Sequence, residues 1–143
     1  MTNPIDAKFE ALKKEISAER HYKVISLDAL LETNFPETNW IIEKLIPREG
    51  ITILSGAPSS FKTWLILQMA LCISNGEKFI GKFESSQGGV LIVDEENHPR
   101  LVKERMQSLG AKNGLPIYIL SRTNFIITDE KQREQLLKAC DEH

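Results

Sequence analysis

Residues 50–63 of this 143-residue chain, GITILSGAPSSFKT, decide its fold. Residues 51–54 are apolar and partly β-branched and have a glycine near each end, which predicts a short buried strand. A second apolar stretch, KTWLILQMALCIS, covers residues 62–74 and precedes an Asn-Gly pair of the kind that commonly ends a helix. A strand, a loop rich in Gly, Pro and Ser, and a helix are therefore expected in direct succession.

The loop between this strand and helix has the composition of a phosphate-binding loop. Its candidate binding residues are Gly56, Ala57, Pro58, Ser59, Ser60, Phe61, Lys62 and Thr63. In such a loop the backbone N–H groups and the helix N-terminus face the phosphates, the lysine brings a positive charge to the β- and γ-phosphates, and the Thr hydroxyl ligates Mg²⁺. The sequence thus predicts a site for ATP and Mg²⁺.

The loop departs from the strict pattern G-x-x-x-x-G-K-[ST], because Phe61 stands where the second glycine belongs. Within the first turn of the helix Phe61 is expected to adopt ordinary helical dihedral angles, so that the difficulty is steric crowding. The alternative is a plain Gly/Pro/Ser turn with Lys62 solvated at the surface. The preceding strand, the following helix and an acidic strand end further along the chain favour the phosphate site.

That acidic strand end is the segment VLIVDEEN at residues 90–97, where a second buried strand, residues 90–93, runs into three carboxylates. Ligands of open α/β sheets bind at this edge. In one interpretation Asp94 holds Mg²⁺ through water and Glu95 is the base. In the other, Glu96 activates the attacking water and the Mg²⁺-holding Asp lies on a later strand. Alternation along a strand puts Asp94 and Glu96 on one face and Glu95 on the other, so only one glutamate should face the phosphate. A third interpretation is three solvated carboxylates, one of which caps the next helix.

The remaining pattern predicts a helix over residues 100–109, a third strand over residues 117–120 and a last helix from about Asp129. Strands that alternate with helices predict an α/β fold: a three-layer parallel sheet with helices on both faces. Three strands are few for such a domain, and the sequence stops inside a helix, so the fold is expected to be incomplete at its C-terminus. Residues 38–143 form this domain.

Residues 1–37 are interpreted as a helical lead-in, with an amphipathic helix over residues 5–20 and a short helix, LDALLE, after Ser26. The chain has a net charge of -2 and 41% hydrophobic residues, the profile of a soluble globular protein without a basic field for nucleic acid. Cys72 and Cys140 have no metal-ligand spacing and are expected to be reduced thiols. With no signal sequence and no membrane-length apolar run, a cytoplasmic location is expected.

From residue 38 to residue 128 the sequence resembles the RecA-like P-loop ATPases of the plasmid RepA helicase type, which include RepA-like ATPases of phages and mobile elements. The resemblance is carried by NWIIEKLIP, GITILSGAPSSFKTWLILQMALCISNG, FIGKF and GGVLIVDEENHPRLVKERMQSLG. It implies that the strand after the phosphate-loop helix ends in the catalytic glutamate, which matches Glu96. It also implies an arginine near the nucleotide that matches Arg105, for which the alternative is an ordinary exposed helix arginine.

The resemblance further implies a homo-oligomeric ring, such as a hexamer, that acts as a DNA helicase or translocase in replication or recombination of a mobile element, with single-stranded DNA as a partner and no membrane. The family's Walker B strand, its DNA-contacting loops and its arginine finger would follow His143, so ATP turnover by these 143 residues alone should be poor. Two rivals remain: a non-catalytic nucleotide-binding or interaction module, which Phe61 favours, and a small-molecule kinase, for which no substrate lid is visible.

Overall fold

The computed structural model describes residues 24–141, and the predicted helix at residues 5–20 lies outside them. The chain divides into two units, residues 1–37 and 38–143. In the first unit, helix α2 (Leu27–Glu32) begins where the side chain of Ser26 accepts a hydrogen bond from the N–H of Ala29 at 3.2 Å. None of the α2 residues is buried. The short helix expected after Ser26 is therefore confirmed.

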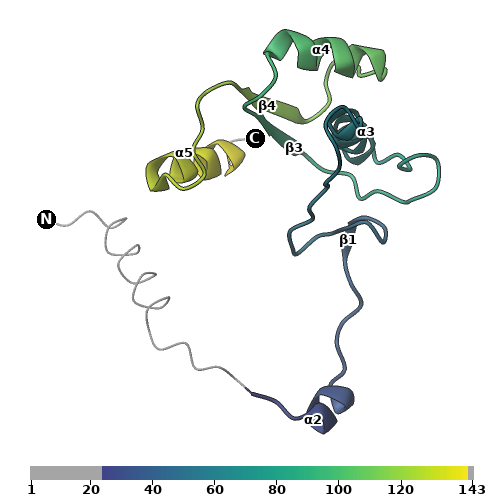
Figure 1. Cartoon of the computed structure of the whole chain (residues 1–143). Helices are drawn as coiled ribbons and strands as arrows, with labels where there is room; N and C mark the ends of the chain where they lie inside the picture. The colour runs from purple at the N-terminus through teal and green to yellow at the C-terminus, as the bar shows by residue number, and fades with distance from the viewer. Residues whose placement is uncertain (1–23, 142–143) are drawn as a thin grey trace, which may run out of the picture. The chain divides into compact units, whose positions relative to one another are not determined.

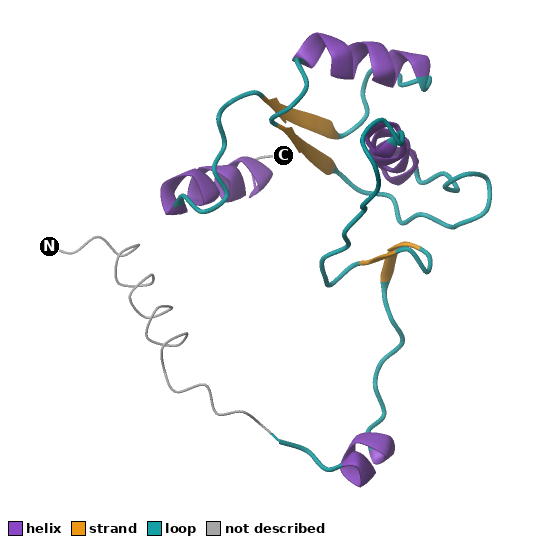
Figure 2. Cartoon of the chain, viewed as in Figure 1, coloured by secondary structure: helices purple, strands orange, loops and turns teal. Residues whose placement is uncertain are grey.

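The second unit alternates short strands and helices (Figure 1 and, coloured by element type, Figure 2). Its elements are β1 (Trp40–Ile42), β2 (Ile46–Pro47), α3 (Lys62–Asn75), β3 (Val90–Asp94), α4 (Pro99–Ser108), β4 (Ile117–Ser121) and α5 (Glu130–Asp141). The elements from α3 onward confirm the sequence-based expectations to within one residue at each predicted end. No helix in residues 24–141 has both the length and the apolar character needed to cross a membrane.

Local capping explains where α3 ends and where α4 begins. Gly76 follows α3 with a left-handed φ of 70°, and its N–H bonds back to the last turn of the helix. His98 caps α4 by accepting a hydrogen bond from the N–H of Arg100 at 3.2 Å, and Pro99 occupies the first turn, where its missing N–H costs nothing. The flanking residues thus set the end of α3 and the start of α4.

The central sheet of the unit is a parallel pair, β3 beside β4, in register from Val90 opposite Ile117 to Asp94 opposite Ser121. One face of the pair packs on helices α3 and α4. The buried cluster there consists of Leu67, Leu71, Val102 and Met106, with Ile92 and Ile117 packed against it. On the opposite face, Leu91 and Tyr118 line a cavity together with Ala139 and Cys140 of α5. Helix α5 borders this cavity, but none of its residues is buried.

The strand expected at residues 51–54 does not form, which corrects the sequence-based prediction. Ile51 is 92% exposed and Ile53 84% exposed. Within residues 24–141 this segment has no neighbouring strand, and β3 and β4 pair only with each other. An extended segment becomes a strand only when its N–H and C=O groups find a partner. The parallel sheet in this part of the chain consequently has two strands and not three.

A small antiparallel hairpin, which was not predicted from the sequence, precedes the loop. β1 and β2 pair with Trp40 opposite Pro47. The hairpin is also tied to a later segment, because the N–H of Glu43 donates to the carbonyl of Glu84 at 2.9 Å and the N–H of Ser86 to that of Ile41 at 2.8 Å. Ile42, completely buried, forms a second apolar cluster with Cys72 and Phe79. This cluster fixes the C-terminal end of α3.

The two isoleucines Ile42 and Ile53 provide a matched test of this fold. Ile42→Ala should lower the free energy of unfolding by about 2–5 kcal/mol, because it leaves a cavity in a fully buried cluster. Ile53→Ala should change it by no more than about 0.5 kcal/mol, because the side chain is already in water. Urea unfolding followed by circular dichroism measures both. Equal losses for the two variants would mean that residues 51–54 are buried in solution.

Candidate functional site

Residues 56–61 wrap tightly around the side chain of Lys62. The N–H of Ser60 reaches the carbonyl of Ala57 at 3.3 Å and closes a turn. A Cβ atom on Gly56 would lie 2.9 Å from the Ser60 hydroxyl oxygen, so a larger residue at this position would displace the Ser60 side chain. The Lys62 ammonium donates to the carbonyls of Gly56 at 2.9 Å and Ala57 at 2.7 Å, and to the Ser60 hydroxyl at 3.3 Å. These hydrogen bonds fix the position of the Lys62 side chain and also stabilise the turn of the loop.

Phe61 has a left-handed backbone, with φ 60° and ψ 18°, so the expectation of ordinary helical dihedral angles is wrong. Left-handed dihedral angles cost an L-residue about 1–2 kcal/mol, which explains why the strict motif has glycine at this position. The Phe61 side chain is 74% exposed, so burial of its ring offsets little of that cost. Ser59 is also left-handed, with φ 62°. The loop is thus formed at the expense of backbone strain.

Helix α3 begins directly after this loop with free N–H groups. Phe61 occupies the position before the helix, and its carbonyl accepts from the N–H of Leu65 at 3.0 Å, but no side chain caps the helix. The first N–H groups of a helix have no partner within it and carry a partial positive charge. An anion at this end would receive their hydrogen bonds.

A cavity of about 670 Å³ opens in front of the loop and the start of α3. It is lined by Gly56, Pro58, Ser59, Ser60, Phe61, Lys62, Thr63, Trp64, Glu96, Asn97 and Arg105. Of the residues selected from the sequence, Ala57 and Asp94 do not line the cavity, although the Ala57 carbonyl accepts a hydrogen bond from Lys62. Trp64 and Asn97 were missed. Their only sequence signals are the positions next to Thr63 and three residues after Asp94.

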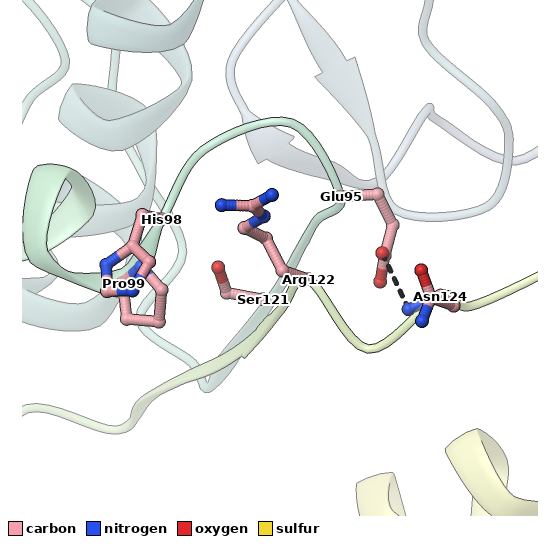
Figure 3. A pocket seen from close by; sticks show the side chains of 6 residues that line it. All are labelled: Glu95, His98, Pro99, Ser121, Arg122 and Asn124. Carbon is pink, nitrogen blue, oxygen red and sulfur yellow. Dashed lines mark hydrogen bonds between the residues drawn. The ribbon is translucent and has the colours of Figure 1, made fainter.

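The two neighbouring glutamates lie in different places. Glu96 lines the cavity, and its carboxylate forms no hydrogen bond or ion pair with any residue that the structure describes. Glu95 lines a separate pocket beside Arg122, shown in Figure 3. Its carboxylate accepts from the N–H of Thr123 at 3.1 Å, from the hydroxyl of that residue at 2.9 Å and from the N–H of Asn124 at 2.9 Å. Glu95 therefore organises the loop after β4.

Desolvation acts to raise the pKa of the Glu95 carboxyl group. The hydrogen bonds from Thr123 and from the backbone N–H groups of Phe125 and Asn124 outweigh this effect and lower the pKa below its usual value. Glu95 is consequently an anion at neutral pH that is committed to holding its loop.

Asp94 shapes the turn that leaves β3. Its Oδ1 accepts from the N–H of Glu96 at 3.0 Å and from the N–H of Asn97 at 2.9 Å, and the Asn97 side-chain amide reaches Oδ2 at 2.9 Å. Burial acts to raise the pKa of Asp94, but these hydrogen bonds and the nearby charge of Arg105 lower it overall. The ionised carboxylate is thus engaged in holding the chain that carries Glu96.

Arg105 reaches the cavity from helix α4. Its Cζ atom lies 5.9 Å from the centroid of the Trp64 ring. Its Nη1 atom is buried and has no hydrogen-bond partner among the described residues. Glu104, the neighbouring acidic residue on the same helix, forms an ion pair of 2.9 Å with Arg100. Arg105 is consequently a cation with an unused donor at the cavity.

The cavity has the chemistry of a polyphosphate site. Lys62, Arg105 and the free N–H groups of α3 supply positive charge and donors, and Glu96 supplies a carboxylate for a water molecule. Within residues 24–141 no group of three or more His, Cys, Asp or Glu side chains could hold a metal ion. A Mg²⁺ ion bound with a phosphate ligand does not need such a group, because phosphate oxygens and water molecules supply most of its ligands, and Thr63 could add its hydroxyl.

Replacing Phe61 by glycine should stabilise the protein. Phe61→Gly removes the left-handed strain and gives up little buried surface, so the free energy of unfolding should rise by about 1 kcal/mol after the extra unfolded-state entropy of glycine is counted. Phe61→Ala is the matched control, because it removes the ring but keeps the strain. Chemical denaturation of the wild type and of both variants measures these free energies of unfolding. A gain for both variants would assign the cost to the ring instead.

Asp94→Asn should weaken the fold in a pH-dependent way. Because the pKa of Asp94 is lowered in the folded protein, its stabilisation is complete above its ordinary value of 3.8 and is lost as the pH falls through the folded value. The variant should lose about 1 kcal/mol at pH 7 from weakened charge-assisted hydrogen bonds, and the difference should shrink on acidification. Asp28→Asn is the control, because the Asp28 side chain makes no such bonds. A pH-independent loss in unfolding titrations would contradict this account.

Comparison with known proteins gives one match. A family model described as an AAA domain (AAA_25) matches residues 17–142. No curated protein and no solved structure matches the chain. The matched range contains the loop, the cavity and all the residues that line it, and it covers most of the sequence. This chain belongs to the AAA domain family of P-loop ATPases.

Proposed function

We propose that the chain binds ATP with Mg²⁺ in the cavity at the start of α3 and is a RecA-like ATPase domain of the RepA type. The observation that carries the proposal is the convergence of Lys62, Thr63, Glu96 and Arg105 on one cavity from three separate segments. Cations, a hydroxyl and an uncommitted carboxylate are the groups that nucleoside triphosphate chemistry requires. A surface turn between a strand and a helix would not need them together.

In this proposal the triphosphate lies along residues 56–63, with its oxygens on the N–H groups of the loop and of the first turn of α3. Lys62 neutralises the β- and γ-phosphates, and the Thr63 hydroxyl ligates Mg²⁺, which would offset the negative charge of the phosphates. Arg105 donates to a phosphate from the α4 side. Asp94 has no direct role in binding the metal, because its carboxylate already holds the backbone of Glu96 and Asn97.

For hydrolysis, Glu96 orients a water molecule and accepts its proton as the water attacks the γ-phosphorus. The bond from that phosphorus to the bridging oxygen breaks, and ADP leaves with the bonding electrons. Glu95 is not suited to this role, because Thr123 and Asn124 occupy its carboxylate. The finer part of the proposal is a homo-oligomeric ring that moves along single-stranded DNA in the replication or recombination of a mobile element. It rests on the resemblance of residues 38–128 to RepA-type helicases, whose three-layer sheet is larger than the two parallel strands described above.

Nucleotide binding is tested by removing the lysine. Lys62→Ala should weaken the binding of a non-hydrolysable ATP analogue with Mg²⁺ by more than about tenfold, because a charge-assisted contact of about 1.5–3 kcal/mol is lost. Isothermal calorimetry measures the affinity, and Lys78→Ala, outside the cavity, is the matched control. Equal affinity of Lys62→Ala and wild type, or no binding by either protein, would disprove the site assignment.

Substitutions of the two glutamates distinguish a role in catalysis from a role in binding. In protein with measurable ATP turnover, Glu96→Gln should bind ATP with nearly unchanged affinity but lose at least about a hundredfold in kcat, the typical contribution of a positioned base. Glu95→Gln should retain turnover and instead destabilise the loop after β4. Phosphate release assays and thermal unfolding distinguish these results. The opposite pattern would make Glu95 the base, and normal turnover in both variants would show that neither glutamate is the base.

A further inference from the structure

Trp64 occupies a position that the phosphate-loop motif does not explain. It is the third residue of α3, it follows Thr63 directly, and it lines the same cavity as Lys62 and Glu96. Its indole ring is part-buried, and its face is turned toward the Arg105 guanidinium, whose central carbon lies 5.9 Å from the ring centroid. A cation at this distance is attracted to the negative face of an indole ring.

No other group that the structure describes fixes the direction of the Arg105 side chain. Glu104, its neighbour on α4, pairs with Arg100. Asp94, whose pKa Arg105 helps to lower, accepts its hydrogen bonds from Glu96 and Asn97 and forms no ion pair with the arginine within residues 24–141. The indole ring is therefore the one specific contact of the guanidinium in this part of the chain.

The ring contact leaves N–H donors of the guanidinium available to other partners, because the guanidinium has five of them. The donor atom Nη1 is buried without an acceptor among the described residues. A buried charged donor without an acceptor is costly, so a ligand oxygen within reach of the guanidinium would stabilise the arginine. A phosphate oxygen is the acceptor that best suits guanidinium geometry.

We propose that Trp64 is a positioning residue, whose indole face holds the Arg105 guanidinium so that its N–H donors reach a phosphate oxygen of the bound nucleotide. This inference rests on the proposed nucleotide site and adds a specific role for a residue outside the loop. It links the first turn of α3, which receives the phosphates, to the arginine that closes on them from α4. Trp64 acts only through Arg105 and does not itself contact the phosphate.

A double-mutant cycle tests this link by calorimetry with a non-hydrolysable ATP analogue and Mg²⁺. Trp64→Leu should weaken binding about fivefold to tenfold while Arg105 is present, and less than about twofold in an Arg105→Met background. Trp64→Phe retains an aromatic face and should stay within about threefold of wild type. Equal weakening by Trp64→Leu in both backgrounds, or no weakening in either, would overturn the inference.

Fluorescence provides a second readout that does not depend on how well the leucine variant folds. In Trp40→Phe protein the only remaining tryptophan is Trp64. Its emission should change when the ATP analogue binds, and the change should disappear in the Arg105→Met variant. An unchanged spectrum at saturating ligand, or a change that persists without Arg105, would contradict the link. If Lys62→Ala loses binding but Trp64 and Arg105 show no coupling, this inference alone is rejected. If Lys62→Ala binds as wild type does, the nucleotide site itself is rejected.

Discussion

The carboxylate of Asp94 makes the contact on which the rest of the candidate site depends. It ends β3 by binding the N–H groups of Glu96 and Asn97, and this turn directs Glu96 into the cavity while Glu95 lies on the side of the β4 loop. The carbonyl of Asn97 then accepts from the Ser121 hydroxyl at 2.7 Å, which fixes the turn to β4. Helix α4 starts immediately afterwards and carries Arg105 to the same cavity. One ionised side chain thus sets the places of the carboxylate and the cation.

The cavity is built from groups that do not favour the ligand-free fold. Phe61 and Ser59 have left-handed backbones, and Arg105 holds a buried donor without an acceptor among the described residues. Strain of this kind persists at binding sites because the surrounding structure enforces it. Here the enforcing contacts are the bonds from the Lys62 ammonium to the loop carbonyls, and the cluster that anchors α3 through Leu67. A ligand that supplies phosphate oxygens would satisfy the arginine and the free helix N–H groups together.

The sequence predicted most helices and the two parallel strands because their signals are local. The glycine after α3, the proline at the start of α4 and continuous apolar runs fix these elements without long-range information. The strand predicted at residues 51–54 does not form, although its residues are apolar. A strand needs a neighbouring strand to pair with, and a local sequence pattern does not show whether one is present. The left-handed backbone of Phe61 was missed because the residue was placed in the first turn of the helix, whereas it occupies the position before the helix. Trp64 was missed because its contact with Arg105 joins two helices across 41 positions of sequence.

The exposed segment at residues 51–54 has a consequence for the loop that it leads into. In residues 24–141 it makes no backbone hydrogen bond to another element, so the loop is held mainly from its other side by Lys62 and α3. A loop anchored from one side loses conformational freedom when a ligand fixes it, and that loss subtracts from the free energy of binding. Any contact that pairs residues 51–54 with a neighbouring strand would remove part of this cost before the phosphates arrive. Strand pairing at this segment and nucleotide affinity are therefore thermodynamically coupled, and each must strengthen the other by the same factor.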